Sequence, residues 1–136
     1  MIDPLIEAAT LARHHAHAPY SRFLVGAALR CDDGSIHAGC NVENAAYPQG
    51  LCAEAGAISA MVLAGGRRIS EIVIAAGGSR PCAPCGGCRQ KIREFAGADA
   101  VIHIVDEHGT LLMQSTLGAL LPHSFGPEDL GFETAS

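Results

Sequence analysis

The fold is decided by residues 69–97, which read ISEIVIAAGGSRPCAPCGGCRQKIREFAG. The first part of this stretch, residues 69–76, contains an unbroken β-branched run at 72–74 with no polar alternation. Such a run is typical of a strand that is covered on both faces, so it predicts a strand in the middle of a sheet. A strand of this kind needs a layer on each side of the sheet, and we therefore expect an α/β layered fold.

The second part of the stretch predicts a helix that begins at a cysteine motif. Four residues follow one another at steps of three, four and three positions: Cys85, Cys88, Ile92 and Phe95. This spacing places them on one face of a helix, which Gly97 would end. The two cysteines therefore share the first helical turn.

The segments on either side extend the layered architecture. Asp3 before Pro4 is a sound helix start with Asp3 as the capping residue, and residues 32–34, DDG, form a good turn between antiparallel strands. The other expected elements are, in chain order, a helix over 4–16, strands over 24–31 and 35–42, a buried helix over 51–63, antiparallel strands over 101–105 and 111–115, and a short helix over 117–121. With the strand at 69–76 they predict one mixed sheet and a single domain over residues 1–136.

Composition limits the classes of function. The net charge is -5, and the nine Lys and Arg residues form no run longer than Arg67-Arg68. Because nucleic-acid binding draws on clustered basic residues, we expect no nucleic-acid partner. Hydrophobic residues make up 49% of the chain and charged residues only 17%. So apolar a composition indicates that some of the surface is buried against other copies of the chain.

The sequence shows no sign of export or membrane insertion. Its N-terminus has no basic region followed by an apolar stretch, and nowhere do eighteen apolar residues run together. We therefore expect a cytoplasmic protein without a membrane partner. In that compartment six cysteines are better explained by metal binding or catalysis than by disulfides.

Two short motifs, CAE and PCGGC, contain the residues that could carry the chemistry. If they converge in space, Cys52, Cys85 and Cys88 offer three thiolates to a zinc ion and leave the fourth position open for water. Glu54 could then reach that water without binding the metal. Both motifs lie at expected helix starts, where unpaired N–H groups stabilise thiolates.

Other interpretations of the cysteines stay open. Cys82 forms a second Cys-x-x-Cys pair with Cys85, but it precedes Pro84 and lies outside the helical face, so we expect a small buried hydrophobe. One alternative is a closed zinc module with Cys82 or a histidine as the fourth ligand. A redox pair is another, although it leaves Cys52 and Glu54 unexplained.

The two motifs match the zinc deaminase signature, with Cys in place of His in the first motif. Five segments extend the match over nearly the whole chain: PYSRF at 19–23, GCNVENA at 39–45, CAE at 52–54, PCGGCRQ at 84–90 and LPHSFGPEDL at 121–130. On these segments the chain resembles the small homotetrameric cytidine deaminases with a three-cysteine zinc site. The resemblance implies a three-layer α/β fold with a mixed five-stranded sheet and helices on both faces.

The resemblance also implies a reaction and a set of roles. The expected reaction is the zinc-dependent hydrolytic deamination of cytidine and 2′-deoxycytidine to uridine and 2′-deoxyuridine with release of ammonia, as in pyrimidine salvage. Glu54 would shuttle protons beside one zinc ion per subunit, which the three cysteines named above would hold. The implied substrate contacts are Asn41 and Glu43 on the ribose 3′-hydroxyl, Phe23 on the base, the Ala53 N–H on ring oxygen 2, the Ala83 carbonyl on the amine, and Phe125 on the pocket of a neighbouring subunit.

The residue types are compatible with these roles but do not require them. An amide offers a donor and an acceptor and an ionised carboxylate accepts, so Asn41 and Glu43 can clasp a hydroxyl. Their alternative role is to satisfy a turn at a sheet edge. Phe23 and Phe125 alone are as typical of a core as of a base-stacking site. None of the seven histidines shows ligand spacing, and we assign them no catalytic role.

Ala55 departs from the family pattern. Many three-cysteine members have an arginine after CAE, and its charge offsets a ligand thiolate. Zinc with three thiolates sums to a charge of -1, so the helix dipoles or Arg89 must compensate here. Two other functions remain open: a zinc deaminase for a nucleic-acid base or a nucleoside antibiotic, and a non-enzymatic zinc module. The acidic charge opposes a nucleic-acid substrate, and the Asn41 and Glu43 pair opposes an antibiotic.

Overall fold

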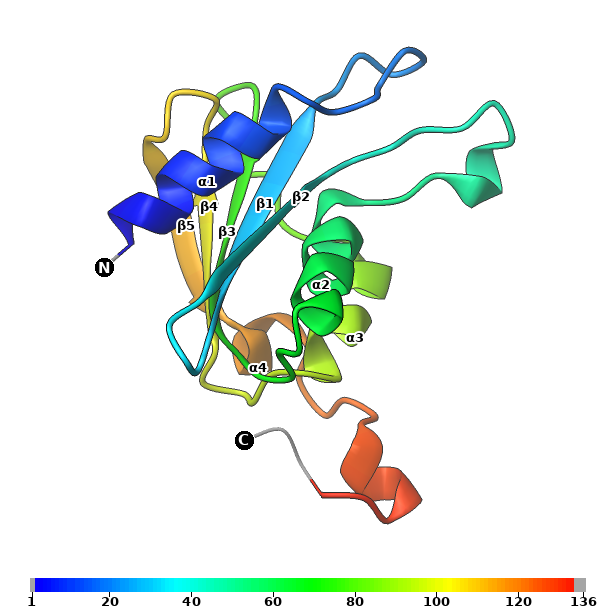
Figure 1. The fold of residues 1–136 in the computed structure, drawn as a ribbon, viewed down its shortest axis with the longest axis vertical. Helices are drawn as coiled ribbons and strands as arrows, with labels where there is room; N and C mark the ends of the chain where they lie inside the picture. The colour runs from blue at the N-terminus through cyan, green and yellow to red at the C-terminus, as the bar shows by residue number, and fades with distance from the viewer. Residues whose placement is uncertain (1, 134–136) are drawn as a thin grey trace.

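The computed structural model describes residues 2–133 and contains one mixed five-stranded sheet (Figure 1). Its strands are β1 (Val25–Cys31), β2 (Ile36–Cys40), β3 (Ile69–Ala76), β4 (Val101–Val105) and β5 (Leu111–Thr116). They lie in the order β2-β1-β3-β4-β5, in which only β3 and β4 are parallel neighbours. The strand expected over 69–76 is confirmed, and it is the central one.

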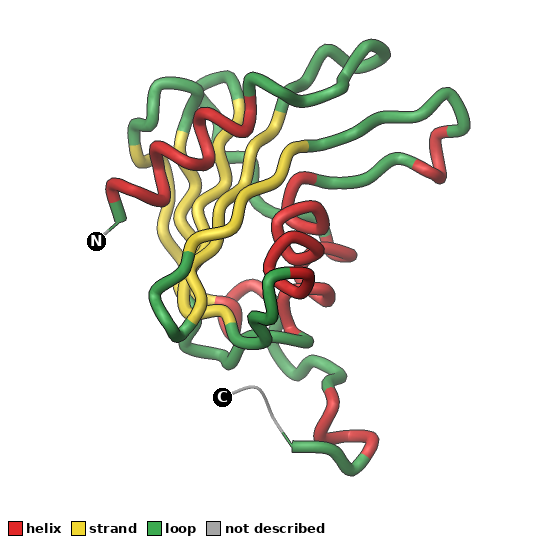
Figure 2. The backbone as a smooth tube through the Cα atoms, viewed as in Figure 1, coloured by secondary structure: helices red, strands yellow, loops and turns green. Residues whose placement is uncertain are grey.

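Helices cover both faces of the sheet (Figures 1 and 2). One face carries α1 (Asp3–Arg13), and the other carries α2 (Ala53–Leu63), α3 (Gly86–Arg93) and α4 (Leu117–Leu120). Along β3 the side chains alternate between the two layers: Val73 packs on the α1 side, while Ile72 and Ile74 join the larger core under α2 and α3. Because both sides are apolar, the strand needs no polar face, which explains its unbroken apolar run.

A close backbone approach fixes α2 against β2. A Cβ atom on Gly39 of β2 would lie only 2.6 Å from the carbonyl carbon of Gly56 and 2.7 Å from the carbonyl oxygen of Ala53. Only glycine therefore fits at position 39. The contact brings the start of α2 to the end of β2, where the chain leaves the sheet toward Asn41.

The first helix is shorter than expected and starts differently. The structure has Asp3–Arg13 instead of 4–16, and Ile2 is the residue before the first turn, so Asp3 lies inside the helix and is not its cap. The helix ends early because the following chain pairs elsewhere: the His17 N–H donates to the Asn41 carbonyl, and His17 forms an isolated bridge with Val42. Tertiary pairing here outweighs the local helical pattern.

The helix expected to run from Cys85 to Gly97 ends at Arg93, so Phe95 lies beyond it. The other expected elements are confirmed with small shifts at their ends. The buried helix begins at Ala53 rather than at 51, because Leu51 pairs with Val42 and Cys52 becomes the N-cap. Two short 3-10 helices, η1 (Tyr47–Gln49) and η2 (Pro127–Leu130), were not expected. Among residues 2–133, no helix combines the length and apolarity needed to cross a membrane.

Candidate active site and metal centre

Two helix N-termini bring three thiols together. Cys52 is the N-cap of α2, Cys85 is the N-cap of α3, and Cys88 lies in the first turn of α3. Their three Sγ atoms all lie within 4.8 Å of one another. The structure therefore assembles the cysteines that the sequence predicts as a ligand set, two from one motif and one from the other.

The donor set fits a zinc ion. Three sulfurs at about 2.3 Å from one tetrahedral ion would lie about 3.8 Å apart, which is compatible with the observed cluster. Burial raises the pKa of the Cys52 and Cys88 thiols, whereas the N–H of Cys88 lowers the pKa of Cys85. Three adjacent thiolates are thus unfavourable by themselves, and a dication supplies the missing counter-charge.

Glu54 stands beside the thiols in the first turn of α2. Its side chain is 6% exposed, and burial raises the pKa of its carboxyl group. It lines a cavity of about 460 Å³ that also contains Cys52 and Cys85. A buried carboxyl group with a raised pKa, beside the thiol cluster, is suited to exchange protons with a bound molecule.

The same cavity is lined by Asn41 and Glu43, whose side chains bond to residues 20–25, the end of the loop after α1 and the first residue of β1. The Asn41 Oδ1 accepts from the Val25 N–H at 2.9 Å, and its Nδ2 donates to the Phe23 carbonyl at 2.9 Å. The Glu43 carboxylate accepts from the N–H groups of Tyr20 and Ser21 at 3.0 and 3.1 Å and from the Ser21 hydroxyl.

These bonds keep Glu43 ionised and leave part of each side chain free. The Ser21 hydroxyl is the main cause of a lowered pKa at Glu43. The Glu43 Oε1 already accepts two hydrogen bonds, but Glu43 Oε2 and Asn41 Oδ1 each accept only one and keep a second lone pair, and the Asn41 amide keeps one N–H. Asn41 and Glu43 can therefore hold the neighbouring backbone and also bind a substrate hydroxyl, because the backbone contacts use only part of their hydrogen-bonding capacity.

Most of the predicted contact residues line this cavity. Phe23, with 44% of its surface exposed, borders it together with Ala53 and Ala83. Phe125 does not: it lies on the C-terminal segment, 58% exposed, and faces a different depression. Within one chain the cavity is thus formed without Phe125.

Sequence reasoning missed several lining residues. Tyr47 and Ser21 border the cavity, and the Tyr47 ring meets the Tyr20 ring edge-on at 6.0 Å between centroids. The segment PYSRF carried a signal for the first loop, but nothing singled out Tyr47. Cys82 is outside the three-thiol cluster, as expected, yet it is half-buried and lines the same cavity.

Arg89 is committed to backbone carbonyls. Its Nε donates to the Pro84 carbonyl at 2.7 Å, and its Nη1 donates to the Leu120 carbonyl at 2.9 Å. The side chain thereby links the loop before Cys85 to the end of α4. Arg89 thus holds the metal-binding loop in place through the Pro84 carbonyl. Among residues 2–133, Arg89 donates no hydrogen bond to a thiol sulfur.

A mixed sheet that gathers three thiols at two helix starts beside a buried glutamate defines a zinc-binding deaminase. Residues 2–104 match the family described as the cytidine and deoxycytidylate deaminase zinc-binding region. The chain belongs to the cytidine deaminase family, and the cysteine cluster is its zinc-binding site.

Relatives and solved structures agree over nearly the full length. The chain is 39% identical to the cytidine deaminase of Sporosarcina psychrophila over 131 residues, which cover 96% of each chain. It is 42% identical over 122 residues to that of Mycobacterium tuberculosis, covering 90% of this chain and 87% of the other. The crystal structure of cytidine deaminase from Burkholderia pseudomallei superposes with a TM-score of 0.80 at 38% identity, covering 92% of this chain and 99% of that one.

Proposed function

We propose that this chain is a zinc-dependent hydrolase that converts cytidine and 2′-deoxycytidine to uridine and 2′-deoxyuridine with release of ammonia, as in pyrimidine salvage. One observation carries the proposal: the buried Glu54 and two members of the three-thiol cluster, Cys52 and Cys85, border the same cavity, which is of nucleoside size at about 460 Å³. No lysine or arginine is among the described residues that line it, which favours an uncharged nucleoside over a phosphorylated substrate.

The proposed site holds the substrate by both of its parts. Asn41 and Glu43 bind the ribose 3′-hydroxyl with the hydrogen-bonding capacity that their loop contacts leave over. The exposed ring of Phe23 packs on the base. The Ala53 N–H donates to ring oxygen 2, and the Ala83 carbonyl accepts from the exocyclic amine. The hydrogen bond from Arg89 to the Pro84 carbonyl holds the loop that contains Ala83 in position.

Glu54 carries the proton transfers in this proposal. Cys52, Cys85 and Cys88 would hold a zinc ion, which would lower the pKa of a water molecule and so supply the nucleophile. Glu54 takes a proton from that water and gives it to ring nitrogen 3. The water oxygen forms a bond to carbon 4, and Glu54 then takes the second proton from that oxygen and gives it to the exocyclic amine. The carbon–nitrogen bond breaks as the oxygen becomes the carbonyl of the product, and ammonia is released.

We also propose a homotetramer whose subunits share their active sites, each chain being one domain over residues 1–136. Large apolar side chains on the surface support association: Leu63 is 91% exposed and Phe132 is 70% exposed. Phe125 would close the cavity of a neighbouring subunit. A cytoplasmic location fits the three-thiol site, because its ligands must stay reduced.

The test is the turnover of cytidine and 2′-deoxycytidine, followed as loss of absorbance at the cytosine band, together with the zinc content. Glu54→Gln should lower turnover by at least about 10²-fold, the usual contribution of a general acid–base residue, and should keep about one zinc per chain. Glu7→Gln is the matched control, because Glu7 is an exposed residue of α1 on the other face of the sheet. Wild-type protein that contains zinc and yet converts neither nucleoside would refute the proposal.

A further inference from the structure

The C-terminal arm, residues 122–132, leaves the body of the molecule beyond α4 (Figure 1, orange to red). It carries three large apolar side chains that remain exposed: Phe125, Leu130 and Phe132. If these side chains are to contact a second subunit in one defined way, the arm must have a fixed orientation. Contacts with α3 fix the orientation of the arm.

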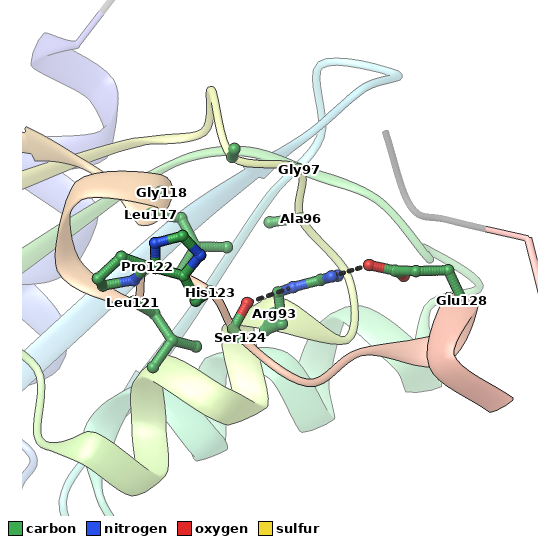
Figure 3. Close-up of a pocket in the computed structure, with 11 residues that line it drawn as sticks. Arg93, Ala96, Gly97, Leu117, Gly118, Leu121, Pro122, His123, Ser124 and Glu128 are labelled. Carbon is green, nitrogen blue, oxygen red and sulfur yellow. Dashed lines mark hydrogen bonds and ion pairs between the residues drawn. The ribbon is translucent and has the colours of Figure 1, made fainter.

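Two side chains on successive turns of α3 hold the arm. The Gln90 Nε2 donates to the Phe125 carbonyl at 2.9 Å, and the Arg93 Nε donates to the Ser124 hydroxyl at 2.8 Å. The other end of the Arg93 guanidinium forms an ion pair with Glu128 (Figure 3). We call Gln90 and Arg93 the arm clamp.

The clamp uses the planar shape of arginine as well as its charge. A Cβ atom on residue 126 would overlap the Arg93 guanidinium, so the flat group lies directly against the backbone of Gly126. Only 14% of the Arg93 side chain is exposed, so its charge is better shielded from water than that of a surface ion pair. A lysine at position 93 would keep the charge but lose the fork and the flat contact.

Hydrogen bonds within the arm hold its residues together around these contacts. The Gly126 N–H donates to the Asp129 carboxylate at 2.8 Å, and the Phe132 N–H donates to the Pro127 carbonyl at 3.1 Å. Contacts at Ser124, Phe125 and Glu128 therefore orient the whole segment. The helix that provides them begins at the metal ligands Cys85 and Cys88, so one rigid element carries both the zinc site and the support of the arm.

We propose that the arm clamp is a positioning device that sets where Phe125 meets the nucleoside cavity of the neighbouring subunit. The proposal rests on the proposed function, in which Phe125 closes that cavity. Gln90 and Arg93 touch neither substrate nor metal; they act through the arm. Weakening the clamp therefore weakens substrate binding in a neighbouring subunit while the zinc site of the same chain remains intact.

The experiment compares Arg93→Gln, Glu128→Gln, their combination, and Phe125→Ala as full-length zinc-loaded proteins. Arg93→Gln and Glu128→Gln should each raise KM for cytidine roughly tenfold, which corresponds to about 1.4 kcal/mol, with a smaller effect on kcat and unchanged zinc content. The double variant should resemble the single ones, because the two residues act as one unit. Arg68→Gln is the control, since Arg68 is exposed and its side chain makes no hydrogen bond or ion pair among residues 2–133.

A second readout follows the arm directly. The wild-type chain has no tryptophan, so Phe125→Trp places a single fluorophore on the arm. Adding Arg93→Gln to this variant should increase quenching by iodide, whereas adding Arg68→Gln should not.

The outcomes separate the two proposals. If Phe125→Ala leaves KM unchanged, the role of Phe125 in a neighbouring site is wrong. If Phe125→Ala raises KM but Arg93→Gln and Glu128→Gln match the wild type, or if quenching of Trp at position 125 does not respond to Arg93→Gln, the clamp is wrong. Loss of zinc in Arg93→Gln would also overturn it, because a positioning role for the arm leaves the metal site intact.

Discussion

Replacing Gly39 by alanine should displace the helix that carries Cys52 and Glu54. The new Cβ atom would lie 2.6 Å from the carbonyl carbon of Gly56, which is about 0.8 Å closer than an ordinary carbon–carbon contact. Both partners are backbone atoms, so the strain is relieved only if α2 moves away from β2. The expected cost is about 3 kcal/mol, the upper end for an overpacked core, which would lower the melting temperature by roughly 10 °C.

The opposite substitution in the same contact is the matched control. A Cβ atom on Gly56 would lie 3.5 Å from the Cα of Gly39, an ordinary van der Waals distance. Because alanine favours a helix over glycine by about 1 kcal/mol, Gly56→Ala should leave the melting temperature unchanged or raise it by a few degrees. The prediction is therefore a difference in melting temperature: Gly39→Ala should melt at a lower temperature than Gly56→Ala.

The assay is thermal unfolding of the zinc-loaded proteins at one protein concentration, because both ligand and association shift the apparent stability. Zinc release to a colorimetric chelator is measured alongside it. Gly39→Ala should release zinc faster than Gly56→Ala, since movement of α2 separates Cys52 from the two ligands on α3. If Gly39→Ala melts and releases zinc like the wild type, the close approach of α2 to β2 does not position the site.

The metal ligands and a polar network give two further predictions. Cys85→Ser should reduce bound zinc strongly, whereas Cys82→Ser should retain about one zinc per chain; equal zinc contents, measured by atomic emission, would contradict the assignment of ligands. Burial alone would raise the pKa of Glu71, but hydrogen bonds from His103 and Arg30 outweigh it, so the folded-state pKa is lowered. The carboxylate thus stabilises the fold above its unfolded pKa of about 4.3 and loses this effect as the pH falls through the folded value. The stability difference between wild type and Glu71→Gln should shrink between pH 6 and pH 3, and a constant difference in urea unfolding across that range would contradict the linkage.

Local sequence patterns predicted helices and strands well where a run of similar residues requires one kind of environment. The run at 72–74 indicated a strand covered on both faces, and β3 has that position because two cores meet on it. The end of the first helix could not be predicted, since the pairing of His17 with Val42 joins residues 25 positions apart. The same holds for the sheet order, which depends on long-range packing.

The chemistry of the site was easier to predict than its support. Spacing alone placed Cys85 and Cys88 on one helical turn, and the CAE motif supplied the third thiol. The anchoring of Glu43 to the N–H groups of Tyr20 and Ser21 had no local signal, because it spans more than twenty residues. Hydrogen bonds of this kind are properties of the fold, and periodicity does not report them.

The structure also indicates how the chain accommodates Ala55. A zinc ion with three thiolates carries a charge of -1, and Arg89 is already bonded to the carbonyls of Pro84 and Leu120. Two helices, however, begin at the thiols, with Cys52 and Cys85 as their N-caps. Each helix N-terminus carries roughly half a positive charge, so the pair offers about one unit.

The partial positive charge of the two helix N-termini therefore balances the charge of -1 on the zinc–thiolate cluster without a charged side chain at position 55. The backbone N–H groups also point at the sulfurs: the N–H of Cys88 lowers the pKa of the Cys85 thiol. With alanine at position 55, the electrostatics of the metal site depend on where the starts of α2 and α3 lie. The packing of Gly39 against α2 is then an electrostatic requirement as well as a steric one, since a displaced helix removes a ligand and its compensating charge together.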